Sequence, residues 1–246
     1  MKKYFLACTL LAALFSCNNS SKTPDGDKNT NKDTVAANPV VAAINLLGSY
    51  VGSFGDNKIT LLIIKATADS IEGRTVVGGN DRPFKGTVKE LNGKYNIVAK
   101  EPGDDQYDGA FDFTIDATQP DVVKGSWKPN KPTATLKEKE YSLQRKAFSY
   151  LQDVGQYPQA SKRLLKEEDV ENLMKPELEM MRNEIFARHG FCFRKKALRE
   201  EFENKDWYVP NTIDIKNELT DIEKKNIALI KRYEKYAEEY GDDFGR

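Results

Sequence analysis

The spacing of apolar residues changes once along this chain of 246 residues, and the change separates two kinds of structure. Between Leu46 and Phe148, short runs rich in β-branched and aromatic residues alternate with turn-forming sequences, of which Asn92-Gly93 is the strongest. Asn-Gly is typical of tight hairpin turns, and about eight such runs without a helical pattern between them predict an antiparallel β-meander. Closing the meander into a small barrel would pair both edge strands. A two-sheet sandwich is the alternative.

Beyond about residue 160 the apolar spacing becomes that of α-helices. One face of the first predicted helix carries residues that are three or four positions apart: Leu178, Met181, Ile185 and His189. Pro176 suits the first helical position and Gly190 the position after the last, so we expect this helix to begin and end there. A short helix over 197–204 and a long helix that starts at a capping box over 220–223 complete an all-α unit.

These patterns predict an α+β protein with two domains. An antiparallel β-meander or small β-barrel occupies residues 46–148, a linker covers 149–160, and a small all-α domain covers 161–246. The β region resembles calycin-type barrels in its pattern alone, because it carries no family motif.

The first 45 residues predict export and attachment to a membrane. Two lysines precede an apolar run over 4–15, which has the length of a signal-peptide core and is too short to span a bilayer. The run leads into Leu-Phe-Ser-Cys, ending at Cys17, which resembles the bacterial lipobox. The resemblance implies that residues 1–16 are a signal peptide and that Cys17 carries lipid, which would anchor the protein in a lipid bilayer. A secretory peptide cut nearby, with Cys17 free, is the alternative.

Composition and charge limit the kinds of partner that this chain is expected to bind. Residues 18 to about 39 contain almost no apolar residues, and we expect the segment 17–45 to form a disordered tether that begins at the lipidated cysteine. The chain has 38 basic and 38 acidic residues, and both signs are spread evenly over the two predicted domains. Because a nucleic-acid-binding protein normally presents a basic face, nucleic acid is excluded as a partner.

The helical region resembles the YARHG domain, a module of bacterial cell-envelope proteins. The motif that gives the family its name reads FARHG here, over residues 186–190, with phenylalanine in place of tyrosine. The likeness covers about residues 161–235 and includes further matching positions: Arg182-Asn183-Glu184-Ile185, Phe193, Trp207-Tyr208, Thr220, Glu223 and Asn226. It implies a fold and an extracytoplasmic compartment. It implies no reaction.

His189 is the single histidine of the chain, and its position favours a structural role. It continues the apolar helical face, so its ring is expected to lie partly inside. It also falls in the last helical turn, where a hydrogen-bonding side chain complements the free carbonyl groups. Gly190 can then adopt the left-handed conformation that ends a helix. Binding or catalysis by His189 is the alternative.

The same region holds the candidate binding residues. Arg188 either pairs with Glu184, four positions before it, or points outward beside Lys195 and Lys196 to meet anionic wall or lipid groups. Trp207 and Tyr208 either offer a platform for stacking sugars or close a small core. With His189, these residues form the predicted binding set.

No catalytic or cofactor motif accompanies these residues. His189 and Cys192 would supply two of the three or four ligands that a zinc site needs, and no Gly-x-Ser-x-Gly sequence accompanies the histidine. We therefore expect a membrane-anchored lipoprotein of the cell envelope, without cofactor or metal, that binds a cell-wall polymer such as peptidoglycan or an envelope protein. The alternatives are a barrel that carries a small ligand, an inhibitor of a lysozyme or peptidase, and, least expected, a hydrolase.

Overall fold

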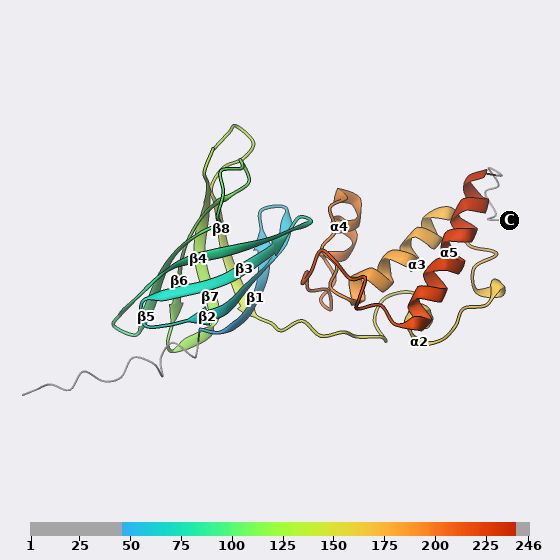
Figure 1. Cartoon of the computed structure of the whole chain (residues 1–246), viewed down its shortest axis with the longest axis horizontal. Helices are drawn as coiled ribbons and strands as arrows, with labels where there is room; N and C mark the ends of the chain where they lie inside the picture. Colours follow the sequence, from blue (N-terminus) through green and yellow to red (C-terminus); the bar gives the residue numbers. More distant parts are fainter. Residues whose placement is uncertain (1–45, 240–246) are drawn as a thin grey trace, which may run out of the picture. The chain divides into compact units, whose positions relative to one another are not determined.

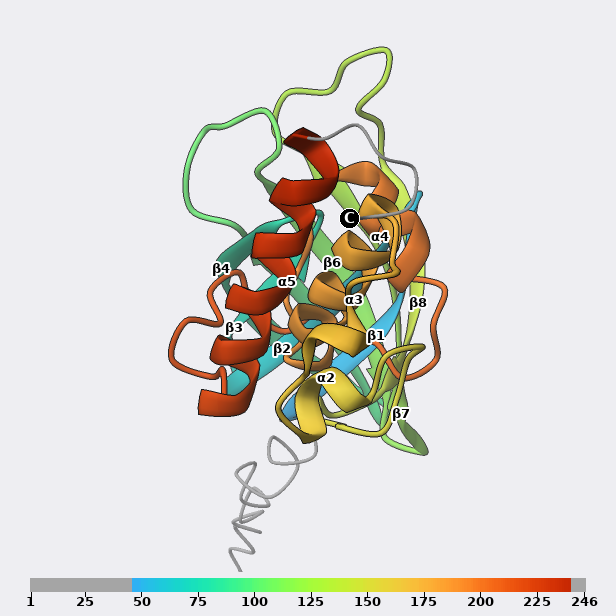
Figure 2. The same cartoon turned by 90° about the vertical axis from the view of Figure 1, so that its right-hand side faces the viewer.

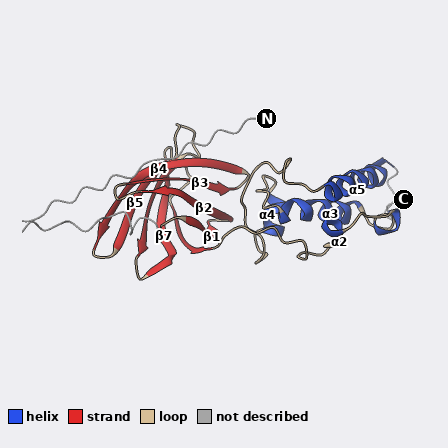
Figure 3. Ribbon diagram, turned by 60° about the horizontal axis from the view of Figure 1, so that its bottom comes forward, coloured by secondary structure: helices blue, strands red, loops and turns tan. Residues whose placement is uncertain are grey.

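The computed structural model describes residues 46–239. The predicted signal peptide over 1–16, the lipid attachment at Cys17 and the tether over 17–45 therefore lie outside the described residues. Residues 46–239 belong to one compact unit. Within residues 46–239 all strands precede all helices, so the predicted α+β class is confirmed (Figure 3).

The strands form a closed antiparallel barrel in which each strand pairs with the next and β8 returns to β1 (Figure 1). The eight strands are β1 (Gly48–Phe54), β2 (Asn57–Ala66), β3 (Ser70–Val77), β4 (Asn80–Leu91), β5 (Lys94–Lys100), β6 (Gly109–Asp116), β7 (Gln119–Pro129) and β8 (Lys139–Arg145). Closure pairs every strand on both sides, which leaves no open edge. The barrel prediction is thus confirmed over the sandwich.

The β4–β5 hairpin shows how the local sequence sets the register. Leu91 pairs with Lys94, and the two residues between them, Asn92 and Gly93, have φ values of 53° and 74°. Both values are positive, as a type I′ turn requires, and Asn-Gly accepts them at the lowest steric cost. This hairpin confirms the prediction made from Asn92-Gly93.

The inward side chains of the barrel form one large apolar cluster. β5 illustrates the pattern, because Tyr95, Ile97 and Ala99 are buried while the residues between them are exposed. Rings from five other strands fill much of the interior: Phe54, Phe84, Phe111, Phe113, Trp127 and Tyr141. An eight-stranded barrel is just wide enough for side chains to fill it or to leave space for one small ligand.

Five helical segments follow the barrel: α2 (Gln159–Lys162), a 3₁₀ turn η1 (Glu167–Asp169), α3 (Lys175–Arg188), α4 (Lys196–Phe202) and α5 (Asp221–Glu239). α3 and α5 lie side by side in both views (Figures 1 and 2), and their facing side chains share a core that includes Leu178, Ile185 and Ile230. Aromatic residues around α4 form a second core. Each predicted helix is present within two residues of its expected start. None of the helices within 46–239 combines the length and apolar character needed to cross a lipid bilayer.

The segment over 149–160, predicted to be a linker, packs onto the helices at two positions. Tyr157 and Ala160 are buried in the core that α3 and α5 share. The backbone N–H of Tyr157 also donates to the Glu184 carboxylate at 2.8 Å. The polar residues and glycine around Tyr157 suggested a linker, whereas long-range contacts hold the segment in place.

The barrel and the helical region also contact one another. The Lys58 backbone N–H donates to Glu203 at 2.9 Å, and the Gly79 N–H donates to the Cys192 sulfur at 3.1 Å. On the outer face of the barrel a row of cross-strand neighbours, Val51, Thr60 and Val76, is buried as well. Outward strand residues normally face solvent, so this burial was not predicted.

Candidate functional site

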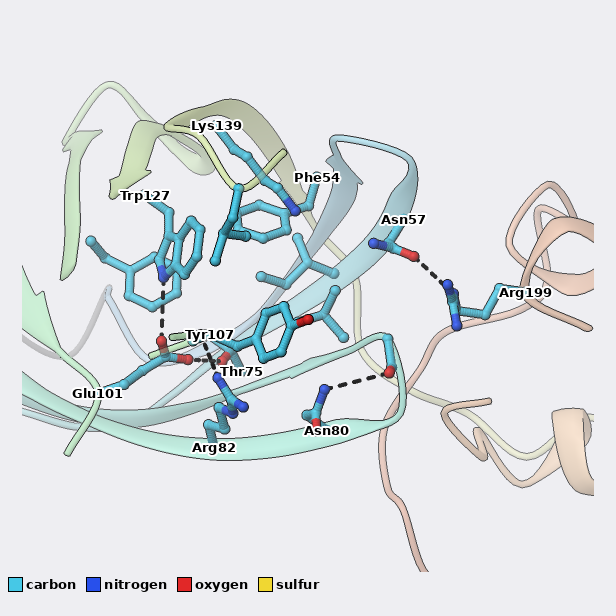
Figure 4. A pocket seen from close by; sticks show the side chains of 15 residues that line it. Phe54, Asn57, Thr75, Asn80, Arg82, Glu101, Tyr107, Trp127, Lys139 and Arg199 are labelled. Carbon is cyan, nitrogen blue, oxygen red and sulfur yellow. Dashed lines mark hydrogen bonds between the residues drawn. The ribbon is translucent and has the colours of Figure 1, made fainter. Parts of the chain in front are cut away.

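A cavity of about 340 Å³ opens at one end of the barrel, where the β1–β2, β3–β4, β5–β6 and β7–β8 loops lie. Figure 4 shows its lining, in which rings and charged groups from the strand ends and loops point toward a common space. The residues that matter below are Phe54, Arg82, Glu101, Trp127, Lys139 and, from α4, Arg199. The volume is at the lower end of the range typical of small-molecule sites, roughly 300–1,000 Å³.

Aromatic rings make one wall of the cavity. The Phe54 and Trp127 rings meet edge to face with centroids 5.7 Å apart. Below them the Phe54 ring packs on Tyr141 at 5.9 Å, which joins the wall to the barrel core. Rings held by such contacts offer a rigid apolar surface to a ligand.

The only acidic side chain in the cavity lining is the buried carboxylate of Glu101. It accepts hydrogen bonds from Gly109 N–H at 2.9 Å, from Trp127 Nε1–H at 3.2 Å and from the Thr75 hydroxyl at 3.2 Å. Burial raises the pKa of Glu101, and these donors together with Arg82 only partly oppose it. The carboxylate also holds the indole of Trp127 in place.

Three cations line the same space, and they differ in how far they are neutralised. Arg82 forms an ion pair with Asp108 at 3.1 Å. The Lys139 ammonium lies 4.6 Å from the centre of the Phe54 ring and 5.8 Å from that of Trp127. The Arg199 guanidinium donates to the Asn57 side chain at 2.8 Å. Within residues 46–239, neither Lys139 nor Arg199 forms an ion pair with a carboxylate.

Sequence reasoning missed this cavity. Its residues come from the ends of the strands, from the loops that join them and from α4, and barrel closure brings them together, so no spacing in the sequence marks them. The one available signal was a charged residue at an inward strand position: Lys139 begins β8 in phase with the buried Tyr141 and Leu143.

His189, in contrast, is tied into a buried polar network. Its Nε2 lies 2.8 Å from the Glu223 carboxylate, and its ring stacks on Tyr150 with centroids 4.4 Å apart. Glu223 also accepts from the Tyr150 hydroxyl at 2.9 Å and the Ser161 hydroxyl at 2.7 Å. Burial alone would raise the pKa of Glu223, but the hydrogen bonds from His189, the Thr220 backbone and Ser161 hold it at about 2.

His189 also ends α3. It is the C-cap residue, and Gly190 follows it with a φ of 70°. The histidine side chain is 6 % exposed. The position, the burial and the left-handed glycine agree with the structural role that the sequence favours.

The outward orientation considered for Arg188 is wrong. Its side chain is buried and donates to Glu184 at 2.9 Å, to the Val154 carbonyl at 2.9 Å and to the Ser161 hydroxyl at 3.1 Å. The i, i+4 pairing with Glu184 is confirmed. Outward placement failed as a prediction because the acceptors on Val154 and Ser161 are more than 25 residues away in the sequence.

Comparison with known families identifies part of the helical region. A family model of the YARHG domain matches residues 156–235. The C-terminal region contains a YARHG domain. The match begins five residues before the predicted start of 161, and it takes in Tyr157 and Ala160 of the segment expected to be a linker. No curated protein and no solved structure matches the chain.

Within the YARHG domain the other predicted binding residues do not gather at one place. Lys195 and Lys196 are exposed before and at the start of α4, and Lys196 lies 3.4 Å from Glu200. Tyr208 is buried, and its hydroxyl donates to the Phe191 carbonyl at 2.8 Å. Trp207 is half-buried against Phe202 and Tyr208. These two aromatic residues close the core around α4.

Proposed function

We propose that this protein is a non-catalytic binding protein of the bacterial cell envelope and that its barrel holds a small molecule. The observation that carries the proposal is the cavity at the end of the barrel, where a rigid aromatic wall faces several charged side chains. An apolar surface with a few convergent polar groups is the usual composition of a small-molecule site. The carrier alternative is therefore favoured over the inhibitor.

The state of the nucleophilic and basic side chains supports a binding role. His189 is engaged by Glu223 and Tyr150. The Ser161 hydroxyl donates to Glu223 rather than to the histidine. Burial raises the pKa of the Cys192 thiol to about 11, which keeps it protonated at neutral pH. These groups are buried and contact other parts of the protein, whereas a catalytic base or nucleophile must reach a substrate.

For the YARHG domain we keep the proposal of a wall polymer or envelope protein as partner. The exposed basic turn at Lys195 and Lys196 supports it. Charge reversal of both lysines is expected to abolish sedimentation with purified peptidoglycan and to leave the melting temperature nearly unchanged. Sedimentation equal to that of the wild type would remove these lysines from the binding surface.

The barrel proposal is tested by filling the cavity. Val77 lines it, whereas Val98 lies on the outer wall and is 49 % exposed, so Val77→Trp and Val98→Trp form a matched pair. A panel of neutral, anionic and cationic aromatic compounds is screened by the shift in melting temperature. We expect Val77→Trp to lose the shifts that the wild type and Val98→Trp share. If no compound shifts the wild type, or if both variants respond alike, the barrel does not hold a ligand in this cavity.

A further inference from the structure

We propose that the cavity selects a compact aromatic carboxylate, whose ring lies against Phe54 and Trp127 and whose acidic group meets the Lys139 ammonium. This inference rests on the proposed function, because it names the class of ligand that the same cavity takes. It is carried by the balance of charges in the lining, by the position of the Lys139 ammonium over the aromatic wall, and by the filling of the barrel below the cavity.

The charge balance favours an anion. The lining holds three cations and one carboxylate. Arg82 forms an ion pair with Asp108, whereas Lys139 and Arg199 have a carboxylate in their surroundings, Asp56 and Glu203 respectively, but form no close ion pair with it. Burial lowers the pKa of the Lys139 ammonium and the charge of Asp56 only partly opposes this, so the side chain is held partly out of water without a close ion pair among residues 46–239. An anionic ligand would supply that partner.

The position of Lys139 places this anion at the edge of the aromatic wall. Its ammonium lies over the faces of both Phe54 and Trp127. A ring that packs on these two side chains would bring a substituent on its rim within reach of the ammonium. Within this wall the Trp127 indole is held by its hydrogen bond to Glu101, so the aromatic surface is formed before a ligand arrives.

The filled core sets the shape of the ligand. Below the cavity the interior is occupied by buried side chains that include Tyr50, Leu61, Ile97 and Leu143. A long acyl chain would need a channel down the barrel axis, and these side chains leave none in the packed cluster. A ring system of about two fused rings is compatible with a cavity of this size.

The test uses three probes and the full chain carrying Cys17→Ala, which keeps every described residue. The probes are 2-naphthoate, its neutral analogue 2-naphthalenemethanol, and dodecanoate, and binding is measured by isothermal titration calorimetry. Because a charge-assisted hydrogen bond is worth more than a neutral one, we expect naphthoate to bind roughly tenfold more tightly than the alcohol. Dodecanoate is expected to bind more weakly than naphthoate.

Variants then assign the selectivity to Lys139. Lys139→Met is expected to remove the preference for naphthoate, so that the acid and the alcohol bind with similar affinity, while Lys139→Arg retains the preference. Lys128→Met is the matched control, because Lys128 follows Trp127 on β7 but points outward and pairs with Glu138. Glu101→Gln is expected to strengthen naphthoate binding by removing the opposing charge.

The outcomes separate the two proposals. Equal affinities for naphthoate and the alcohol in the wild type, or an equal loss of both in Lys139→Met, would overturn the anion selectivity and leave the barrel as a ligand site. Tighter binding of dodecanoate than of naphthoate would overturn the compact shape. Failure of every probe to bind would count against the proposed function itself.

Discussion

Tyr150 and His189 stack with their ring centroids 4.4 Å apart, and both side chains contact the same carboxylate, that of Glu223. Tyr150 precedes α2, His189 ends α3, and Glu223 lies in the first turn of α5. One carboxylate therefore joins three segments of the helical region. His189 therefore helps to hold these three segments together.

Removing the histidine ring is expected to weaken the fold. His189→Ala deletes the stacking contact and one hydrogen bond to Glu223, which should cost about 1–3 kcal/mol in the free energy of unfolding. Urea denaturation measures the change, and Lys195→Ala, on the exposed turn, serves as the control within about 0.5 kcal/mol of wild type. Full stability together with lost binding would show that the histidine serves a ligand.

Acid is expected to destabilise the protein through Glu223. Its pKa is about 2 in the fold, against 4.5 ordinarily, so its ionised form stabilises the fold above pH 4.5. This contribution, on the order of 3 kcal/mol, is lost as the pH falls from about 4.5 to about 2. Urea denaturation between pH 7 and pH 2.5 should show a steeper loss for the wild type than for Glu223→Gln. Parallel curves would contradict the assignment.

Gly190 is expected to resist substitution more strongly than another left-handed glycine. A Cβ at Gly190 would lie 2.8 Å from a Phe148 ring carbon and 2.9 Å from the Val209 carbonyl oxygen. Gly78 has a similar φ of 59° but nothing within 4 Å of such a Cβ. Alanine at either site costs the backbone strain, about 1 kcal/mol, and Gly190→Ala should add a steric penalty. We expect Gly190→Val to be at least as damaging as His189→Ala. Equal melting temperatures for the two alanine variants would show that the crowding is relieved by small shifts.

The segment before α2 is expected to decide whether the helical part folds alone. We predict that residues 40–150 give a β-rich circular dichroism spectrum as a separate fragment. The fragment 160–246 lacks Tyr150 and Tyr157, so it should be less helical or less stable than the fragment 147–246. Equal helicity and equal melting temperature for the two helical fragments would show that the segment adds nothing. Should neither half fold while the whole chain does, the contacts of Lys58 and Gly79 with the helical part are essential.

The predicted anchor is tested by partitioning. When the chain is expressed in a bacterium that has the lipoprotein pathway, the wild type is expected in the detergent phase of a Triton X-114 extraction. Cys17→Ala is expected in the aqueous phase, because it lacks the sulfur that would carry lipid. Cys192→Ala is the control, since this thiol is buried in the fold. Identical partitioning of wild type and Cys17→Ala would argue against lipidation.

The parts of the structure that local sequence determines were predictable. Asn92-Gly93 specified a hairpin, the Thr220 and Glu223 pair formed the expected capping box, and Gly190 ended a helix. Each of these features depends on residues within a few positions of one another. Alternation and turn spacing likewise predicted an antiparallel β-meander, and the structure decided between the barrel and the sandwich.

The features that escaped prediction depend on distant residues. Arg188 looked like a surface cation because its acceptor carbonyl on Val154 is 34 residues away. Tyr157 looked like part of a linker because its partner Glu184 lies in another element. The barrel cavity has no sequence signature at all, since Glu101 and Lys139 face one space only after β8 has met β1.

The long span of the Glu223 contacts has a consequence for the order of folding. Barrel closure is complete once Arg145 reaches Tyr50, whereas Tyr150 must wait for a carboxylate that follows it by 73 residues. Because a chain is synthesised from its N-terminus, the β domain can therefore finish folding before α5 has been synthesised. The YARHG domain then assembles late, against a barrel that is already rigid.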